Sequence, residues 1–165
     1  MLIFQYKITS PTPIGEDDRN IFRIDVTDNK QDNAITWFYD KEYRHTLPRK
    51  EISRIKNIIK EHPDLFEIPE YLEPSDMDGG SDYSFTFCDG ARSNSFSGDN
   101  ILDYGRKPHK NATLALRVAR EVKEKVLEPN HIRTMISSRL QHWPKYRKEP
   151  DLIPPCGCPR LKIRQ

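Results

Sequence analysis

Alternating apolar and polar positions predict strands at residues 2–8, 20–27 and 34–40. In the second of these, Phe22 and Ile24 fall on one face of an extended backbone, and Arg23 and Asp25 fall on the other. Turn-forming residues fill positions 28–33, so we expect the second and third runs to form an antiparallel hairpin.

An aromatic hairpin is the clearest local signal. Strands are predicted at 81–88 and 92–97, joined at Asp89-Gly90, a dipeptide typical of tight hairpin turns. In the first strand, Tyr83 and Phe85 alternate with small or polar residues. We expect the aromatic side chains to face the core, and Ser84, Thr86 and Cys88 to face the opposite side.

Helical spacing of apolar residues predicts three helices. The first covers 49–61, with Thr46 as N-cap and Pro63 as its stop. The second covers 112–127 after the N-cap Asn111 and ends at Pro129. The third covers 131–142, where Ile132, Met135, Ile136 and Leu140 form an apolar stripe.

These elements predict an α+β fold: a mostly antiparallel sheet of four or five strands with a central aromatic hairpin, covered by two or three helices. The chain length suits one domain at 1–144, followed by a basic, proline-rich tail at 145–165 that is draped on the body or partly disordered. The predicted core is Phe22, Ile24, Trp37, Ile55, Ile59, Tyr83, Phe85, Phe87, Val118, Val122, Ile132 and Ile136.

Composition changes this picture mainly through charge. Hydrophobic residues make up 35% of the 165 residues and charged residues 32%, so the chain is polar for a globular protein. Residues 1–105 carry 12 Lys/Arg against 20 Asp/Glu, and residues 106–165 carry 15 against 5. Two interpretations stay open: the halves neutralise each other in the fold, or one of them faces a charged partner.

The sequence contains no apolar stretch long enough to cross a bilayer and no recognisable secretory leader. Three cysteines, Cys88, Cys156 and Cys158, are an odd number for a disulfide framework, so a cytoplasmic location is expected. Whether Cys156 and Cys158 are free, oxidised or metal-bound stays open.

No motif supports a catalytic, cofactor or metal site. A single residue, Gly157, separates Cys156 from Cys158, which is fewer than in the usual zinc pairs. The acidic run around Asp76 and Asp78 lacks the glycine and glutamate positions of a calcium-binding EF-hand loop. A hydrolase using His142 with Lys145 and Arg147 is a third-ranked alternative, because residues of this kind occur by chance in basic tails.

Nucleic-acid binding is the second interpretation. Aromatic and cationic residues interleave after Trp143, where cations would neutralise phosphates and rings would stack on bases. The candidate contacts are Lys145, Tyr146, Arg147, Lys148, Arg160, Lys162 and Arg164.

The first interpretation is a non-catalytic protein-binding module of inhibitor or immunity type. It would present an acidic surface within residues 1–105, including Asp76, Asp78 and Asp82, to a basic partner protein. No cofactor and no membrane partner are expected, and the oligomeric state is left open.

Overall fold

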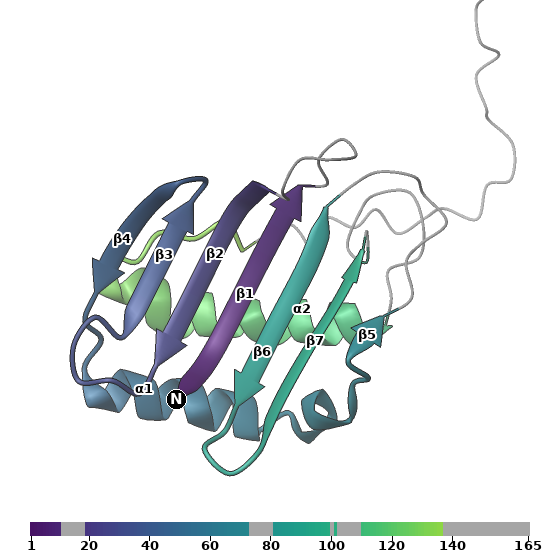
Figure 1. Ribbon diagram of the computed structural model, residues 1–165. Coiled ribbons are helices and arrows are strands. Elements are labelled where there is room, and N and C mark those ends of the chain that lie inside the picture. The colour runs from purple at the N-terminus through teal and green to yellow at the C-terminus, as the bar shows by residue number, and fades with distance from the viewer. Residues whose placement is uncertain (11–18, 73–80, 100, 102–109, 137–165) are drawn as a thin grey trace, which may run out of the picture.

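A seven-stranded sheet forms the body of the protein (Figure 1). The computed structural model describes residues 1–10, 19–72, 81–99, 101 and 110–136. The strands are Leu2–Ser10 (β1), Arg19–Thr27 (β2), Ala34–Phe38 (β3), Lys41–His45 (β4), Tyr71–Leu72 (β5), Asp82–Cys88 (β6) and Ser93–Asp99 (β7). Their order is β4-β3-β2-β1-β6-β7-β5, and every pair is antiparallel except β5 and β7.

Two helices cover one face of this sheet, and no described helix covers the other, which we call the open face (Figure 1). They are α1, Arg49–Lys60, and α2, Lys110–Val122. Helical backbone continues after α2 through a wider turn, Lys123–Leu127 (η2), and a tight turn, Glu128–Asn130 (η3). A similar tight turn, Pro63–Glu67 (η1), follows α1. The fold is therefore α+β, as predicted, with more strands than expected.

Aromatic rings dominate the covered face of the sheet. Phe85 contacts Phe96 and Tyr6, each with ring centroids 5.3 Å apart. The series continues from Tyr6 to Phe22 at 6.2 Å and from Phe22 to Phe38 at 5.1 Å. Because neighbouring strands supply successive rings, this row joins five strands of the sheet into one apolar layer under the helices.

Ten of the twelve predicted core residues are buried. The prediction is wrong for Trp37, which lies half-buried on the open face, and Tyr83 is also only half-buried. In β3 the residues facing the core are Ala34, Thr36 and Phe38, because Phe38 lies opposite Phe22 in the register. The strand itself was predicted, but not the face that turns inward.

Two strands were not predicted. Strand β4 has the sequence KEYRH, whose first four residues are exposed, so it carries no apolar alternation. Strand β5 has only two residues and pairs with β7 far from it in sequence. Gly98 makes this pairing possible, since a Cβ there would lie 2.9 Å from the Leu72 carbonyl oxygen. Both strands depend on long-range packing that short sequence windows do not encode.

The aromatic hairpin is confirmed, but its turn is longer than predicted. Cys88 pairs with Ser93, so a loop of four residues joins β6 and β7. Of these four, Gly90 has a positive φ, 99°. The Asp89 carboxylate accepts hydrogen bonds from the backbone N–H groups of Ala91 (2.9 Å) and Arg92 (2.7 Å), which organises the longer loop.

The predicted third helix is wrong over 131–136, and its remainder lies outside the described residues. Pro129 falls at the start of η3, so helical backbone runs past it and ends at His131, whose φ is 60°. Beyond His131 the chain has no regular structure, yet Ile132 and Ile136 are buried and Met135 is exposed. The burial of Ile132 and Ile136 is therefore confirmed, whereas the burial of Met135 and the helical backbone over 131–136 were predicted wrongly.

Asn33, which is 2% exposed, links the β2–β3 loop to Leu47, just before α1, by hydrogen bonds. Its side chain accepts from the Leu47 N–H (2.7 Å) and donates to the Leu47 carbonyl (2.9 Å). Thr46, the predicted cap of α1, instead accepts from the Asp32 N–H at 3.2 Å. The residue at the cap position is Pro48.

We expect Asn33→Ala to lower the free energy of unfolding by about 2 kcal/mol, because it leaves two buried backbone groups of Leu47 without partners. Urea unfolding followed by circular dichroism measures the change. Asn29→Ala, an exposed substitution in the same loop, is the matched control and should change stability little. Equal stability of the two variants would show that the Asn33 contacts are not structural.

No helix among the described residues is long and apolar enough to cross a membrane. The predicted boundary between a domain at 1–144 and a tail at 145–165 lies outside the part of the chain that the structure describes.

Candidate functional site

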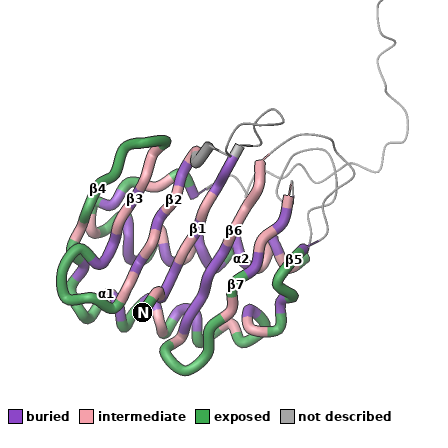
Figure 2. Tube along the Cα trace, viewed as in Figure 1, coloured by how far each residue is buried: buried purple, intermediate pink, exposed green. Residues whose placement is uncertain are grey.

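The open face of the sheet is the face on which no described helix packs (Figures 1 and 2). Strand pairing assigns two rows of side chains to it. In strand order these are Glu42, Trp37, Arg23, Lys7, Ser84 and Ser97 in one row, and Arg44, Ile35, Asp25, Gln5, Thr86 and Ser95 in the other.

Ile35 and Trp37 form an apolar centre on this face. They lie two residues apart on β3, so their side chains point the same way, and both are half-buried. The Arg23 guanidinium stacks over the Trp37 ring at 4.9 Å, and the indole Nε1 donates to Glu42 Oε2 at 3.0 Å. These two contacts restrain the orientation of the indole ring.

Asp25 ties this centre to the middle of the sheet. Its carboxylate accepts a hydrogen bond from Arg23 Nε at 2.9 Å and a second one from another guanidinium nitrogen, which makes a bidentate ion pair. The side-chain amide of Gln5 donates to the same carboxylate at 2.8 Å. We call Gln5, Arg23, Asp25, Ile35, Trp37 and Glu42 the Trp37 cluster; it spans β1 to β4 and is fixed by its own polar contacts.

Small hydroxyl residues occupy the other half of the open face. Ser84, Thr86, Ser95 and Ser97 lie on β6 and β7, and the Thr86 and Ser95 hydroxyls are 2.9 Å apart. The open face thus has two halves. An aromatic and charged half lies on β2, β3 and β4, and a half lined by small hydroxyl residues lies on β6 and β7.

One end of this hydroxyl half is acidic. Asp82, one of the predicted partner contacts, lies directly opposite Asp99 in the β6–β7 pair. The Tyr71 hydroxyl donates to Asp99 at 3.2 Å. Asp76 and Asp78 lie outside the described residues. Of the three predicted acidic contacts, the structure therefore places one.

The acidic excess of residues 1–105 is not spread over the sheet. Their described part carries 12 Lys/Arg against 13 Asp/Glu, so almost the whole excess belongs to segments outside it. Segment 11–18 connects Ser10 of β1 to Arg19 of β2, and segment 73–80 precedes β6. The strand ends next to these segments are neighbours, since Ser10 pairs with Arg19 and Thr9 pairs with Asp82.

The predicted nucleic-acid contacts, Lys145 to Lys148 together with Arg160, Lys162 and Arg164, lie outside the described residues, as do Cys156 and Cys158. On the described open face, Lys7, Arg23 and Arg44 are outnumbered by Asp25, Glu42, Asp82 and Asp99. This balance does not favour phosphate binding on that face.

The described residues contain no group of three His, Cys, Asp or Glu side chains that could hold a metal ion. His62 contacts Glu121 at 3.3 Å between the end of α1 and α2. Burial acts to raise the pKa of Glu121, but hydrogen bonds from Lys125 and His62 outweigh it and hold that pKa below its ordinary value. An ionised, doubly partnered glutamate of this kind links the two helices and is poorly suited to deliver a proton.

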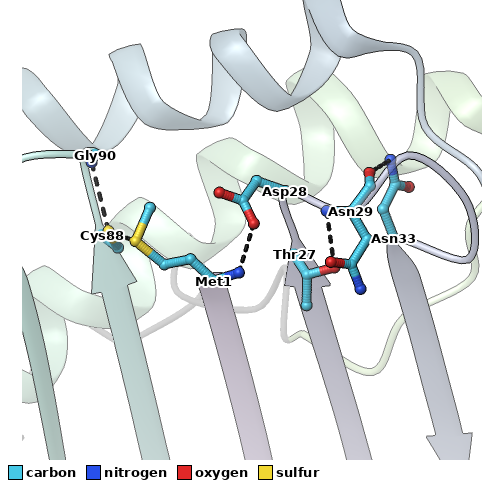
Figure 3. A network of polar contacts seen from close by, with 7 residues as sticks. All are labelled: Met1, Thr27, Asp28, Asn29, Asn33, Cys88 and Gly90. Carbon is cyan, nitrogen blue, oxygen red and sulfur yellow. Dashed lines mark hydrogen bonds and ion pairs between the residues drawn. The ribbon is translucent and has the colours of Figure 1, made fainter.

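A polar network at the other end of the sheet is also structural (Figure 3). The Met1 ammonium group pairs with Asp28 across β1 and β2, and its hydrogen bond holds the Asp28 pKa below the ordinary value. Nearby, the Gly90 N–H donates to the buried Cys88 sulfur at 3.4 Å. The Cys88 thiol is also 3.9 Å from the Met1 sulfur, so the contacts at this end link the start of β1 to the end of β6 and to the β6–β7 loop.

Acid should weaken the β6–β7 loop through Asp89. Its pKa is lowered, chiefly by the backbone N–H of Arg92, and its side chain also pairs with the Arg92 guanidinium at 2.9 Å. A lowered folded-state pKa means that this stabilisation is present above the unfolded pKa and is lost as pH falls through the folded pKa.

We therefore expect Asp89→Asn to be less stable than wild type at neutral pH, and the difference to shrink at about pH 3, below the ordinary carboxyl range. Urea unfolding at both pH values measures it. Asp64→Asn, at an exposed carboxylate on η1, controls for the change in net charge. A difference that stays constant with pH would contradict the role given to the Asp89 charge.

Comparison with known proteins adds no assignment: a scan against protein-family models finds no match, and a search of curated proteins finds none at a significant level. The site is therefore defined by its geometry. Sequence reasoning missed the Trp37 cluster because it placed Trp37 in the core. The sequence does contain a signal for it. Ile35 and Trp37 share one face of the strand and Phe38 lies on the other, so only one of these two faces can turn toward the core.

Proposed function

We propose that this chain is a non-catalytic protein-binding module that holds its partner on the open face of the sheet. The observation that carries the proposal is the Trp37 cluster: an apolar centre of Ile35 and Trp37 surrounded by fixed charges on an uncovered surface. Protein interfaces concentrate their binding energy in such places, where an aromatic residue or arginine is enclosed by a polar rim.

Rigidity supports the same proposal. The cluster lies on four neighbouring strands, and ion pairs and hydrogen bonds already restrain Trp37, Arg23 and Gln5. A surface whose side chains are restrained before binding loses less conformational entropy when the partner docks. The acidic end at Asp82 and Asp99 would meet basic groups of the partner, and the predicted contribution of Asp76 and Asp78 belongs to this part of the proposal.

The nucleic-acid alternative stays tied to the tail residues named from the sequence. It makes a different prediction, since phosphate contacts would be lost at high salt and with residues 145–165 deleted. The hydrolase alternative, built on His142, Lys145 and Arg147, gains no support from the described side chains.

Capture from the native host's lysate separates these alternatives. The full chain is immobilised, the lysate is treated with nuclease, and bound material is identified at low and high salt for the wild type and for Trp37→Ala. A nuclease-resistant, stoichiometric protein that Trp37→Ala fails to retain supports the proposal. Recovery of nucleic acid that depends on residues 145–165, or of a protein bound equally by both baits, would refute it.

A further inference from the structure

The edge of the sheet at β4 is a second surface, besides the open face, on which another chain could bind. On its outer side, β4 has no neighbouring strand in the described sheet, and its first four residues are exposed (Figures 1 and 2). In an antiparallel edge strand, every second residue turns its N–H and C=O groups away from the sheet. Such an edge is a template for another strand unless the chain prevents pairing.

The aromatic row of the covered face ends on this edge. Phe38 contacts Phe22 on one side and Tyr43 on the other, with 6.0 Å between the Phe38 and Tyr43 ring centroids. Tyr43 is 48% exposed. Arg133 lies over the Phe38 ring at 5.6 Å. The row therefore stops at an aromatic ring that has protein on one side and solvent on the other.

Charges on β4 are arranged symmetrically about the same residue. Glu42 and Arg44 lie on either side of Tyr43, both belong to the open face, and within one chain the Arg44 Nε is 2.6 Å from Glu42 Oε1. If two copies of β4 pair antiparallel with Tyr43 opposite Tyr43, Glu42 of each copy lies opposite Arg44 of the other. Charged edges of one sign repel a second copy, whereas in that register the Glu42 and Arg44 charges match; the same register places Lys41 of each copy opposite His45 of the other on the covered side.

We infer that β4 pairs with β4 of a second copy of this chain, antiparallel, with Tyr43 on the two-fold axis. One register meets two independent requirements: it continues the aromatic row through a Tyr43–Tyr43 contact on the covered side, and it places two Glu42–Arg44 pairs on the open side. A five-residue strand offers less contact than the roughly 800 Å² per partner of stable complexes, so the dimer is weak and concentration-dependent.

The inference goes beyond the proposed function and is tested without any partner. Analytical ultracentrifugation of the full chain is run over concentrations up to the millimolar range. We expect a monomer–dimer equilibrium for the wild type and a loss of dimer of at least tenfold in association constant for Glu42→Arg and for Arg44→Glu, because each places like charges in register. Lys30→Glu, in the β2–β3 loop, and Glu67→Arg, on η1, change exposed charges outside β4 and should dimerise as the wild type does.

A charge-exchange experiment distinguishes this register from any other dimer. Mixing the Glu42→Arg and Arg44→Glu chains should restore dimer, since each then faces the opposite charge, and the double variant should restore it within one chain. Circular dichroism confirms that each variant is folded. A wild type that stays monomeric, or single variants that dimerise normally, or a mixture that stays monomeric, would overturn the inference.

Discussion

Phe85→Asp is expected to abolish folding. Phe85 is 1% exposed, belongs to the aromatic row and contacts the rings of Tyr6, Phe87 and Phe96. Removing the ring alone costs about 3–5 kcal/mol, and an unpaired carboxylate in that apolar layer adds several more. The sum approaches or exceeds the roughly 5–15 kcal/mol by which a native domain is stable.

Far-ultraviolet circular dichroism and thermal unfolding test this expectation. Ser84→Asp, one position earlier on β6, is the matched control: Ser84 faces the open side opposite Lys7 and should accept a carboxylate. The pair of variants therefore reports which face of β6 is inside. A cooperative transition for Phe85→Asp at the wild-type temperature would show that the assigned strand face is wrong.

The second large effect concerns binding. Trp37→Ala removes the apolar centre of the open face and releases Arg23 and Glu42 from their contacts with the indole. Aromatic residues at the centre of an interface contribute about 2 kcal/mol or more, which corresponds to roughly a thirtyfold loss of affinity. Because Trp37 is outside the core, we expect the variant to fold, with a smaller loss of stability than Phe85→Asp.

Calorimetric titration of the captured partner measures this effect. Met135→Ala truncates another exposed apolar residue, in the segment after η3, and serves as the control. We expect the control to bind as the wild type does. If Trp37→Ala and the wild type bind the purified partner with equal affinity, the partner does not use the centre of the open face.

Local patterns determined how much of the fold was predictable. In β6, large rings alternate with small residues, so Phe85 and Phe87 could be assigned to the core from the sequence. In β3, both faces carry a large side chain. Ile35 and Trp37 make one face more hydrophobic in the sequence than the face with Ala34 and Phe38, so the sequence alone favours the wrong face. The face is decided by the neighbouring strand, because Phe22 pairs with Phe38 and a one-residue slip would expose both.

The same reasoning explains why the candidate site was not visible beforehand. Gln5, Asp25 and Glu42 are unremarkable polar residues in the sequence, and only the β1–β2–β3–β4 order brings them around Trp37. Strand β4 gave no signal because an exposed edge needs no apolar residue. The acidic surface, by contrast, was inferred from total charge, which does not say where charges gather; in the described part of residues 1–105 they nearly balance.

The most direct test of the proposed binding face is a nuclear magnetic resonance titration of the nitrogen-labelled chain with its captured partner. The sequence has two tryptophans, so the indole Nε1–H signal of Trp37 can be assigned by comparing the wild type with Trp37→Ala. We predict that this signal and the backbone amides of β1, β2 and β3 shift or broaden on binding, while those of α1 stay unchanged. Changes confined to α1 and α2, with the Trp37 signal unaffected, would contradict the account.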